Sequence, residues 1–348
     1  MKTGDRENGA AATRLGDGLT RRGVIAGLAA LVLAPEHPSA QQAPAKILRV
    51  GILGCGETER TPMYDAFRQG LHDLGHIEGR NIILEFRLAH GDYSQFPRLA
   101  AELADLPVEV IVAGTRAVDI ASGWVPVVVP TLFDPVGQGL ASSLSRPGGN
   151  VTRFTLMSAE LDAKRLELLK SAFPQISAVS VLRGGPPNAG PKTDVERIER
   201  AAAALGLGTA RTVEALDVAS LRALRPAVFA GTDAVIVLGS GLFWDYRRDI
   251  VALANQARLP AIYPDREYVD DGGLMVYGAN VPDNFRRAAD YVDRILKGAK
   301  PELPIQEPVR FDFIVNVKTA QELGLTISID PRPRRRGHRI KAIGFASG

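Results

Sequence analysis

Apolar and polar positions follow two regular periods along most of the chain. Short apolar runs predict strands, and apolar residues three and four positions apart predict the helices between them. In the first half, strands are predicted at residues 47–53, 81–87, 108–113 and 125–133, with helices at 62–74 and 93–103. Strands that alternate with helices at these spacings need crossover connections, so we expect a parallel sheet that is covered on both faces.

The same pattern restarts after the turn-rich stretch SRPGGN at residues 145–150. Further strands are predicted at residues 178–184, 209–213, 233–241 and 273–278, helices at 159–172, 193–205, 220–229, 246–257 and 283–296, and a strand and helix pair at 309–323. A flexible Gly/Ser linker does not separate the two halves. The sequence therefore predicts an α/β protein in which two similar parallel-sheet units follow each other.

The stretch RVGILGCGETER at residues 49–60 raises the question of a dinucleotide site. Gly54 and Gly56 fit the first two glycines of such a motif, but Glu59 occupies the third position. The carboxylates of Glu57 and Glu59 would oppose a pyrophosphate at a helix N-terminus. A strand end followed by a turn is the leading interpretation, and an NAD-dependent oxidoreductase that uses the first unit is the alternative.

Residues 20–40 (TRRGVIAGLAALVLAPEHPSA) have the organisation of an export signal. Arg21 and Arg22 precede an apolar stretch that is too short to span a bilayer, and small residues end it at Ala40. We predict a cleavable signal peptide over residues 1–40 and a periplasmic mature protein. Twin-arginine and general secretory export both fit this segment, whereas a retained membrane anchor fits it less well.

Charge is distributed unevenly along the chain, whose formal net charge is +3. Residues 331–348 hold six basic residues and no acidic one, while residues 41–330 hold 31 basic and 35 acidic residues, a net charge of −4. A mildly acidic body gives no support to nucleic-acid binding, and we predict none. The basic residues from 328 to 348 are predicted to form a disordered tail.

Six stretches, in this order along the chain, resemble one family of transport proteins. They are AFRQGLHDLGHIEGRNIILEFRLAHGDYSQFPRLAAEL, SLSRPGGNVTRFT, AKRLELLK, PAIYPDREYVDDGGLMVYG, RILKGAKPELPIQEP and NVKTAQELGL. From about residue 47 to 327 the chain is similar to the ABC-transporter solute-binding family, whose members include aromatic amino-acid binders. The resemblance implies a protein without enzymatic activity that captures a small-molecule solute, possesses no cofactor or metal site, acts as a monomer and delivers the solute to an ABC permease.

The resemblance also implies a fold, the type I periplasmic binding protein, in which two Rossmann-like lobes are joined by three crossing segments. The expected N-terminal lobe covers residues 46–157 and 277–306, and the expected C-terminal lobe covers residues 158–276 and 307–327. Family members usually continue past the last matching stretch with an apolar segment, whereas this chain becomes strongly basic. A shifted reading frame near residue 328 and a genuine basic arm both account for that departure.

Ligands of open parallel sheets bind beyond the carboxyl ends of the strands, so the loops after strands supply the candidate site. The candidate ligand-binding residues are Cys55, Gly56, Thr115, Asp134, Asn188, Ser240, Asp245 and Arg266. If the solute is an amino acid, Thr115 and backbone amides suit its carboxylate, and Asp134 or Asp245 suits its ammonium group. In the loop where family members often carry several asparagines, this chain has GGPPNAG and retains Asn188.

Several candidate side chains have a structural alternative. Phe243, Trp244 and Tyr263 are candidates for covering an apolar part of the solute, with core packing as the alternative. Arg266 is a candidate for anchoring a carboxylate, but pairing with Asp265 or Glu267 is the interpretation we favour. Cys55 is interpreted as a loop thiol rather than a nucleophile, because no His partner lies near it in the sequence.

Overall fold

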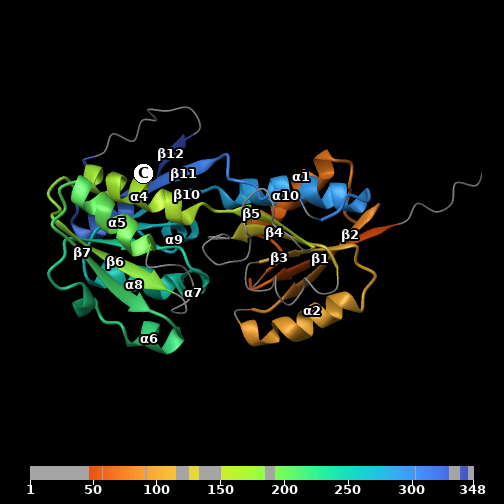
Figure 1. Cartoon of the computed structure of the whole chain (residues 1–348), viewed down its shortest axis with the longest axis horizontal. Helices are drawn as coiled ribbons and strands as arrows, with labels where there is room; N and C mark the ends of the chain where they lie inside the picture. Colours follow the sequence, from red (N-terminus) through yellow and green to blue (C-terminus); the bar gives the residue numbers. More distant parts are fainter. Residues whose placement is uncertain are drawn as a thin grey trace, which may run out of the picture. The chain divides into compact units, whose positions relative to one another are not determined.

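The computed structural model describes residues 47–56, 58–90, 92–114, 125–132, 150–184, 193–301, 303–328 and 338–343 (Figure 1). Within these residues the strands form two sheets, one of five strands and one of seven. We call the part built around the five-stranded sheet lobe 1 and the part built around the seven-stranded sheet lobe 2. The expected architecture of two α/β lobes is confirmed.

Lobe 1 has a fully parallel sheet in the order β2-β1-β3-β4-β5. Its strands are β1 (Leu48–Gly54), β2 (Ile82–Leu88), β3 (Val110–Ala113), β4 (Val127–Leu132) and β5 (Val151–Thr155). Its helices are α1 (Pro62–Asp73), the short 3₁₀ helix η1 (Tyr93–Gln95), α2 (Phe96–Ala104) and α10 (Val281–Leu296). Helices α1 and α10 lie side by side on one face of the sheet, and α2 covers the other face (Figure 1).

Lobe 2 has the strand order β12-β11-β10-β9-β8-β6-β7. Its strands are β6 (Ala178–Gly184), β7 (Thr209–Ala215), β8 (Ala234–Val237), β9 (Ala261–Tyr263), β10 (Met275–Ala279), β11 (Phe311–Asn316) and β12 (His338–Ile343). Its helices are α4 (Ser158–Ala172), α5 (Thr193–Ala204), α6 (Val218–Ala223), η3 (Pro226–Phe229), α7 (Gly241–Asp245), α8 (Arg247–Gln256), α9 (Glu267–Asp270) and α11 (Val317–Leu323). Strand β11 runs antiparallel to β10, so this sheet is mostly rather than entirely parallel.

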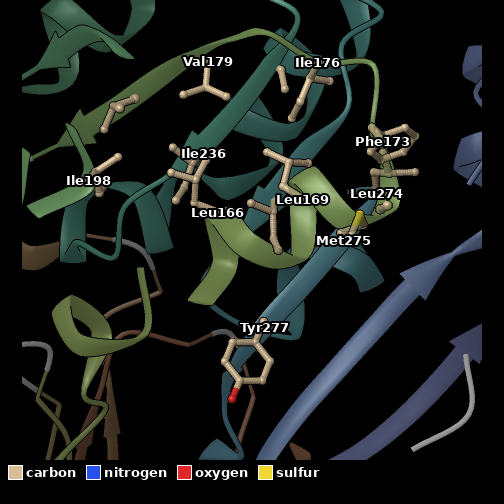
Figure 2. Close-up of a cluster of buried hydrophobic side chains, with 14 of the residues drawn as sticks. Leu166, Leu169, Phe173, Ile176, Val179, Ile198, Ile236, Leu274, Met275 and Tyr277 are labelled. Carbon is tan, nitrogen blue, oxygen red and sulfur yellow. The ribbon is translucent and has the colours of Figure 1, made fainter. Parts of the chain in front are cut away.

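Lobe 2 has a core on each face of its sheet, and one of them lies between the sheet and the helices α4 and α5. Figure 2 shows Leu166 and Leu169 of α4 meeting Val179 and Ile236 of the sheet, with Ile198 from α5 beside them. All five side chains are fully buried. Burial of a side chain of this size contributes about 1.5–3 kcal/mol to the free energy of folding. This layer is therefore a large source of the stability of lobe 2.

Several local features differ from the predicted pattern. Strands β5 and β9 and helix α9 were not predicted, and the residues at the end of the predicted strand 233–241 and after it form helix α7 (Gly241–Asp245). The helix predicted over residues 220–229 is interrupted before Pro226, because proline restricts the preceding residue to extended backbone and Arg225 adopts φ −131° and ψ 156°. In the tail expected to be disordered, β12 pairs in parallel with β11; the alternating sequence HRIKAI is compatible with an edge strand.

Three segments connect the two lobes, after β5, after β10 and before β11. The first and third are joined by hydrogen bonds from Thr155 N to Gln306 O (2.9 Å) and from Gln306 N to Arg153 O (3.0 Å). Strand β10 pairs with β9 at Met275 and Val276 and with β11 up to Ala279. The second crossing therefore follows this strand, whereas the boundary expected after residue 276 divides it. None of the helices in the described ranges combines the length and apolar character needed to cross a membrane.

Candidate functional site

A pocket of about 160 Å³ lies at the carboxyl ends of the lobe 1 strands and is closed by residues of lobe 2. Its walls are predominantly apolar. Lobe 1 contributes Leu53, Gly54, Cys55, Gly56, Thr61, Met63, Tyr64, Phe96, Val112, Ala113, Gly114, Thr131, Leu156, Val281 and Phe285, and lobe 2 contributes Gly241, Trp244 and Asp245. Small-molecule sites commonly combine such apolar walls with a few polar groups that fix orientation.

The lobe 1 wall depends on the close approach of Tyr64 to the end of β1. A Cβ atom at Gly54 would lie 2.3 Å from the Tyr64 hydroxyl oxygen, so any other residue here would displace the Tyr64 phenol. The Tyr64 ring also makes edge-to-face contacts with Phe86 and Phe285, at centroid distances of 5.3 and 5.7 Å. Burial, and secondarily the neighbouring Cys55, raises the pKa of Tyr64 to about 12, so its phenol stays neutral.

The N-terminus of α1 opens onto this pocket. Thr61 caps the helix, since its hydroxyl oxygen accepts a hydrogen bond from Tyr64 N (3.3 Å), and Pro62 fits the first helical position because it needs no backbone partner there. The hydroxyl of Thr61 keeps its own proton for donation to a ligand. The first turn of a helix carries partial positive charge, so this wall suits an anionic group such as a carboxylate.

The lobe 2 wall is the short helix α7, which follows β8. Ser240 caps it by accepting a hydrogen bond from Phe243 N (3.1 Å), and the fully buried Phe243 ring anchors it in the lobe 2 core. Trp244 and Asp245 at the end of α7 then line the pocket. The Trp244 side chain packs against the core of lobe 1, so one aromatic ring contacts both lobes.

Asp245 is the charged side chain among the described lining residues. Burial raises its pKa to about 8, and the opposing effect of the Arg247 guanidinium is smaller. A carboxyl group of this kind holds a proton at neutral pH until a cation arrives, and a bound ammonium group would favour its ionised form. The geometry therefore provides an acidic group on lobe 2 and a helix N-terminus on lobe 1.

Further acidic groups lie in lobe 2 after β9. Burial raises the pKa of Asp265 to about 6 and that of Glu267 to about 7. The rings of Tyr263 and Tyr268 are stacked at 5.0 Å, and among the described residues neither phenol oxygen has a hydrogen-bond partner. The Tyr268 phenol is close enough to the carboxyl groups of Asp265 and Asp245 for their charges to raise its pKa further.

The structure brings three of the eight candidate residues to the pocket: Cys55, Gly56 and Asp245. Ser240 instead caps α7. Arg266 pairs with Asp270 (Nε to Oδ2, 3.5 Å) rather than with Asp265 or Glu267 as expected, because both lie one turn apart on the chain around α9. Thr115, Asp134 and Asn188 lie outside the described residues.

The aromatic candidates separate into two groups. Phe243 and Tyr263 are fully buried in the lobe 2 core, whereas Trp244 lines the pocket. Sequence reasoning missed Tyr64 and Phe285, whose spacing on apolar helix faces is also that of core residues. Their positions in the chain do give a signal. Tyr64 and Phe285 each lie in the first two turns of a helix that follows a strand, and side chains at such positions can reach the carboxyl ends of strands.

The first-strand glycines do not form a dinucleotide loop. Gly54 admits the Tyr64 phenol, as described above, and a Cβ atom at Gly56 would meet nothing within 4 Å. The third glycine of that motif, which permits close packing of the helix on the strand, is replaced by Glu59. The comparisons with known proteins likewise give no support to the oxidoreductase alternative.

Two kinds of relatives share most of the chain's length. A tyrosine-binding protein of Clostridioides difficile (strain R20291) is 24% identical over 293 residues, covering 78% of this chain and 81% of the relative. A Streptococcus pneumoniae ABC domain solved in complex with L-Trp has a TM-score of 0.70 at 23% identity and covers 80% of this chain and 95% of that one. Both likenesses extend over the two lobes.

A third comparison is the ligand-free, open structure of a substrate-binding protein with adhesive properties from Clostridium difficile. It has a TM-score of 0.62 at 22% identity and covers 85% of this chain and 99% of that one. The family model described as ABC transporter substrate binding protein matches residues 57–330, which is most of the chain and includes the described pocket residues from Thr61 onward. The chain belongs to the family of ABC transporter substrate-binding proteins.

Proposed function

We propose that the protein captures a free amino acid, or a small amine of similar size, in the pocket between its lobes. One observation carries this proposal: an otherwise apolar pocket has a carboxyl group from lobe 2, Asp245, and a helix N-terminus from lobe 1, α1. These two groups are complementary to the ammonium and carboxylate groups of an amino acid. The tyrosine-binding relative and the L-Trp complex support an aromatic amino acid in particular.

The apolar walls accommodate the side chain of such a solute. Leu53, Phe96 and Trp244 line the pocket, and an indole offers a flat face on which another ring or an ammonium group can rest. Since the groups that hold the solute come from both lobes, the solute favours the closed arrangement and shifts the population toward it. The captured solute is then handed to the permease of an ABC importer.

Calorimetric titration with L-tyrosine and L-tryptophan tests this proposal, with NAD included to test the oxidoreductase. The variant Asp245→Asn removes the charge at constant size, and we expect it to weaken binding by about 1–3 kcal/mol, roughly 5- to 150-fold. Asp249→Asn, an exposed carboxylate in the first turn of α8, is the matched control and should bind as the wild type does. Equal affinity of Asp245→Asn and wild type would refute the role of Asp245.

We also propose that the mature protein works outside the cytoplasm, because substrate-binding proteins of ABC importers receive their solutes there. Residues 1–40 would then be removed as a signal peptide close to Ala40, through either the twin-arginine or the general secretory route. Mass spectrometry of the protein from a periplasmic extract should find an N-terminus near Gln41. An intact N-terminus on a cytoplasmic protein would contradict this part of the proposal.

Closure would occur about the three crossing segments, with the second crossing placed after β10. Small-angle scattering should then show a smaller radius of gyration with the solute than without it, and a mass equal to one chain if the protein acts as a monomer. An unchanged radius with a solute that binds by calorimetry would exclude a hinge of this kind.

A further inference from the structure

Arg247, the first residue of α8, lies against the lobe 2 wall of the pocket without lining it. Its guanidinium carbon is 5.7 Å from the centre of the Trp244 ring, and its Nη1 donates a hydrogen bond to the Trp244 carbonyl oxygen (3.2 Å). A guanidinium over an indole face is a favourable cation–π arrangement. The same side chain therefore contacts both the ring and the backbone of Trp244.

Arg247 forms an ion pair with Asp271. Its Nε lies 2.7 Å from Asp271 Oδ2, and the other oxygen of Asp271 pairs with Arg248 Nε at 3.0 Å. The two arginines differ sharply in exposure, since the Arg248 side chain is 82% exposed and that of Arg247 is 27% exposed. Of the two ion pairs, the one between Arg247 and Asp271 is therefore shielded from solvent, and salt screens it less.

The charge of Arg247 also reaches the acidic groups around the pocket. Its guanidinium lowers the pKa values of Asp245, Asp265 and Glu267 relative to what burial alone would give. Arg165, a buried arginine of α4, also lowers the pKa of Asp265. Among the described residues, the other titratable groups around Asp245 are Tyr268 from α9 and, in the lining of the same pocket, Tyr64 and Cys55 of lobe 1.

We propose that Arg247 is the positioning residue of the lobe 2 half of the site: paired with Asp271, it stacks on Trp244, fixes that ring against lobe 1 and places its positive charge near Asp245. The second part rests on the proposed function, because an ionised Asp245 matters only if the solute carries an ammonium group. Arg247 does not contact the solute in this arrangement. It acts through the two side chains that do.

The sign of each effect follows from the charges. Arg247→Met keeps most of the stem and removes a positive charge near Asp245, so the pKa of Asp245 should rise by about one pH unit. Arg248→Met removes the exposed arginine that pairs with Asp271 and should leave the pKa unchanged, because solvent screens that charge.

The experiment is a carbon-13 NMR titration of aspartate carboxyl groups in the solute-free protein, with the Asp245 signal assigned by its loss in Asp245→Asn. We expect a higher titration midpoint in Arg247→Met and an unchanged one in Arg248→Met. Because Arg248→Met removes the other arginine on Asp271, it controls for a general disturbance of the fold. An unchanged midpoint in Arg247→Met would overturn the proposal, whatever solute the protein binds. If Arg247→Met fails to fold, Arg247→Gln replaces it, with the same expected rise and the same refuting result.

Binding measurements then test the link to capture separately. Between pH 6 and 8.5 the affinity of the wild type for L-tyrosine should increase as Asp245 ionises, and this rise should be displaced to higher pH in Arg247→Met, with about tenfold weaker binding at pH 7. Arg247→Lys retains the charge and loses the planar stack, so it should bind more weakly at every pH with the wild-type midpoint. A shifted NMR midpoint without any binding of amino acids would refute the proposed function and leave the role of Arg247 in place.

Discussion

Replacing Arg165 with methionine should destabilise the protein far more than replacing its neighbour Lys164. Arg165 lies on α4 with a side chain that is 1% exposed, forms an ion pair with the buried Asp162, and donates a hydrogen bond from Nε to Tyr277 O (2.7 Å). Arg165→Met removes the countercharge of a buried carboxylate and a bond between α4 and β10. Losing one partner of a buried ion pair costs about 3–5 kcal/mol.

The same helix supplies a matched control. Lys164 and Glu167 are also three residues apart on α4, with Nζ 2.6 Å from Oε1, but their side chains are 43% and 52% exposed. Because solvent screens such a pair, Lys164→Met should cost less than about 0.5 kcal/mol. The two substitutions share the helix, the spacing and the new residue, and differ mainly in burial.

Thermal unfolding followed by circular dichroism measures the difference. With roughly 2–4 °C of Tm per kcal/mol for a chain of this size, Arg165→Met should lower Tm by about 6–20 °C and Lys164→Met by 2 °C or less. The double variant Asp162→Leu with Arg165→Met should recover part of the loss, since it leaves no buried charge. Equal losses in the two single variants, or no recovery in the double variant, would refute the reasoning.

Two further predictions concern lobe 2. Burial raises the pKa of Asp265 to about 6 and that of Glu267 to about 7, so their contribution to stability is complete below about pH 4 and is lost as the pH rises through 6 and 7. The Tm of the wild type should therefore fall from pH 5 to 8. An equal fall of Tm with pH in the double variant Asp265→Asn with Glu267→Gln would contradict this. Gly278→Ala would place Cβ 1.7 Å from the Pro264 carbonyl oxygen and should cost about 3 kcal/mol or more in denaturant unfolding, whereas Gly208→Ala, with its nearest contact at 3.8 Å, should cost under about 1 kcal/mol.

The sequence predicts strands best where both faces of a strand are buried. Residues 178–184 form β6 with the predicted bounds, because the mostly apolar stretch AVSVL between turn residues leaves little choice. The direction of β11 was not predictable, since its six residues have the same pattern whichever way the strand runs. Helix α7 is five residues long, which is too short for a helical period to be visible.

The residues of the candidate site likewise divide into those that the sequence predicts and those that it does not. Cys55 and Asp245 were predicted because a residue that follows a strand is placed by topology. Tyr64 and Phe285 were not, because each belongs to the lobe 1 core and lines the pocket at once, and an apolar period cannot separate these two roles. The position of Trp244 against lobe 1 depends on contacts between residues far apart in the sequence, which no local pattern contains.

The packing of α10 on lobe 1 has a consequence for how the chain is made. The strands of lobe 1 are complete at Thr155, but Phe285, Ala288, Val292 and the rest of the apolar face of α10 follow only after the chain has passed through most of lobe 2. At a synthesis rate of about 5–20 residues per second, residues 156–280 take about 6–25 s to appear. During that interval α1 lies on one face of the lobe 1 sheet without α10 beside it. A chain arrested before residue 281 should therefore be a substrate for chaperones, although every strand of its sheet has already been synthesised.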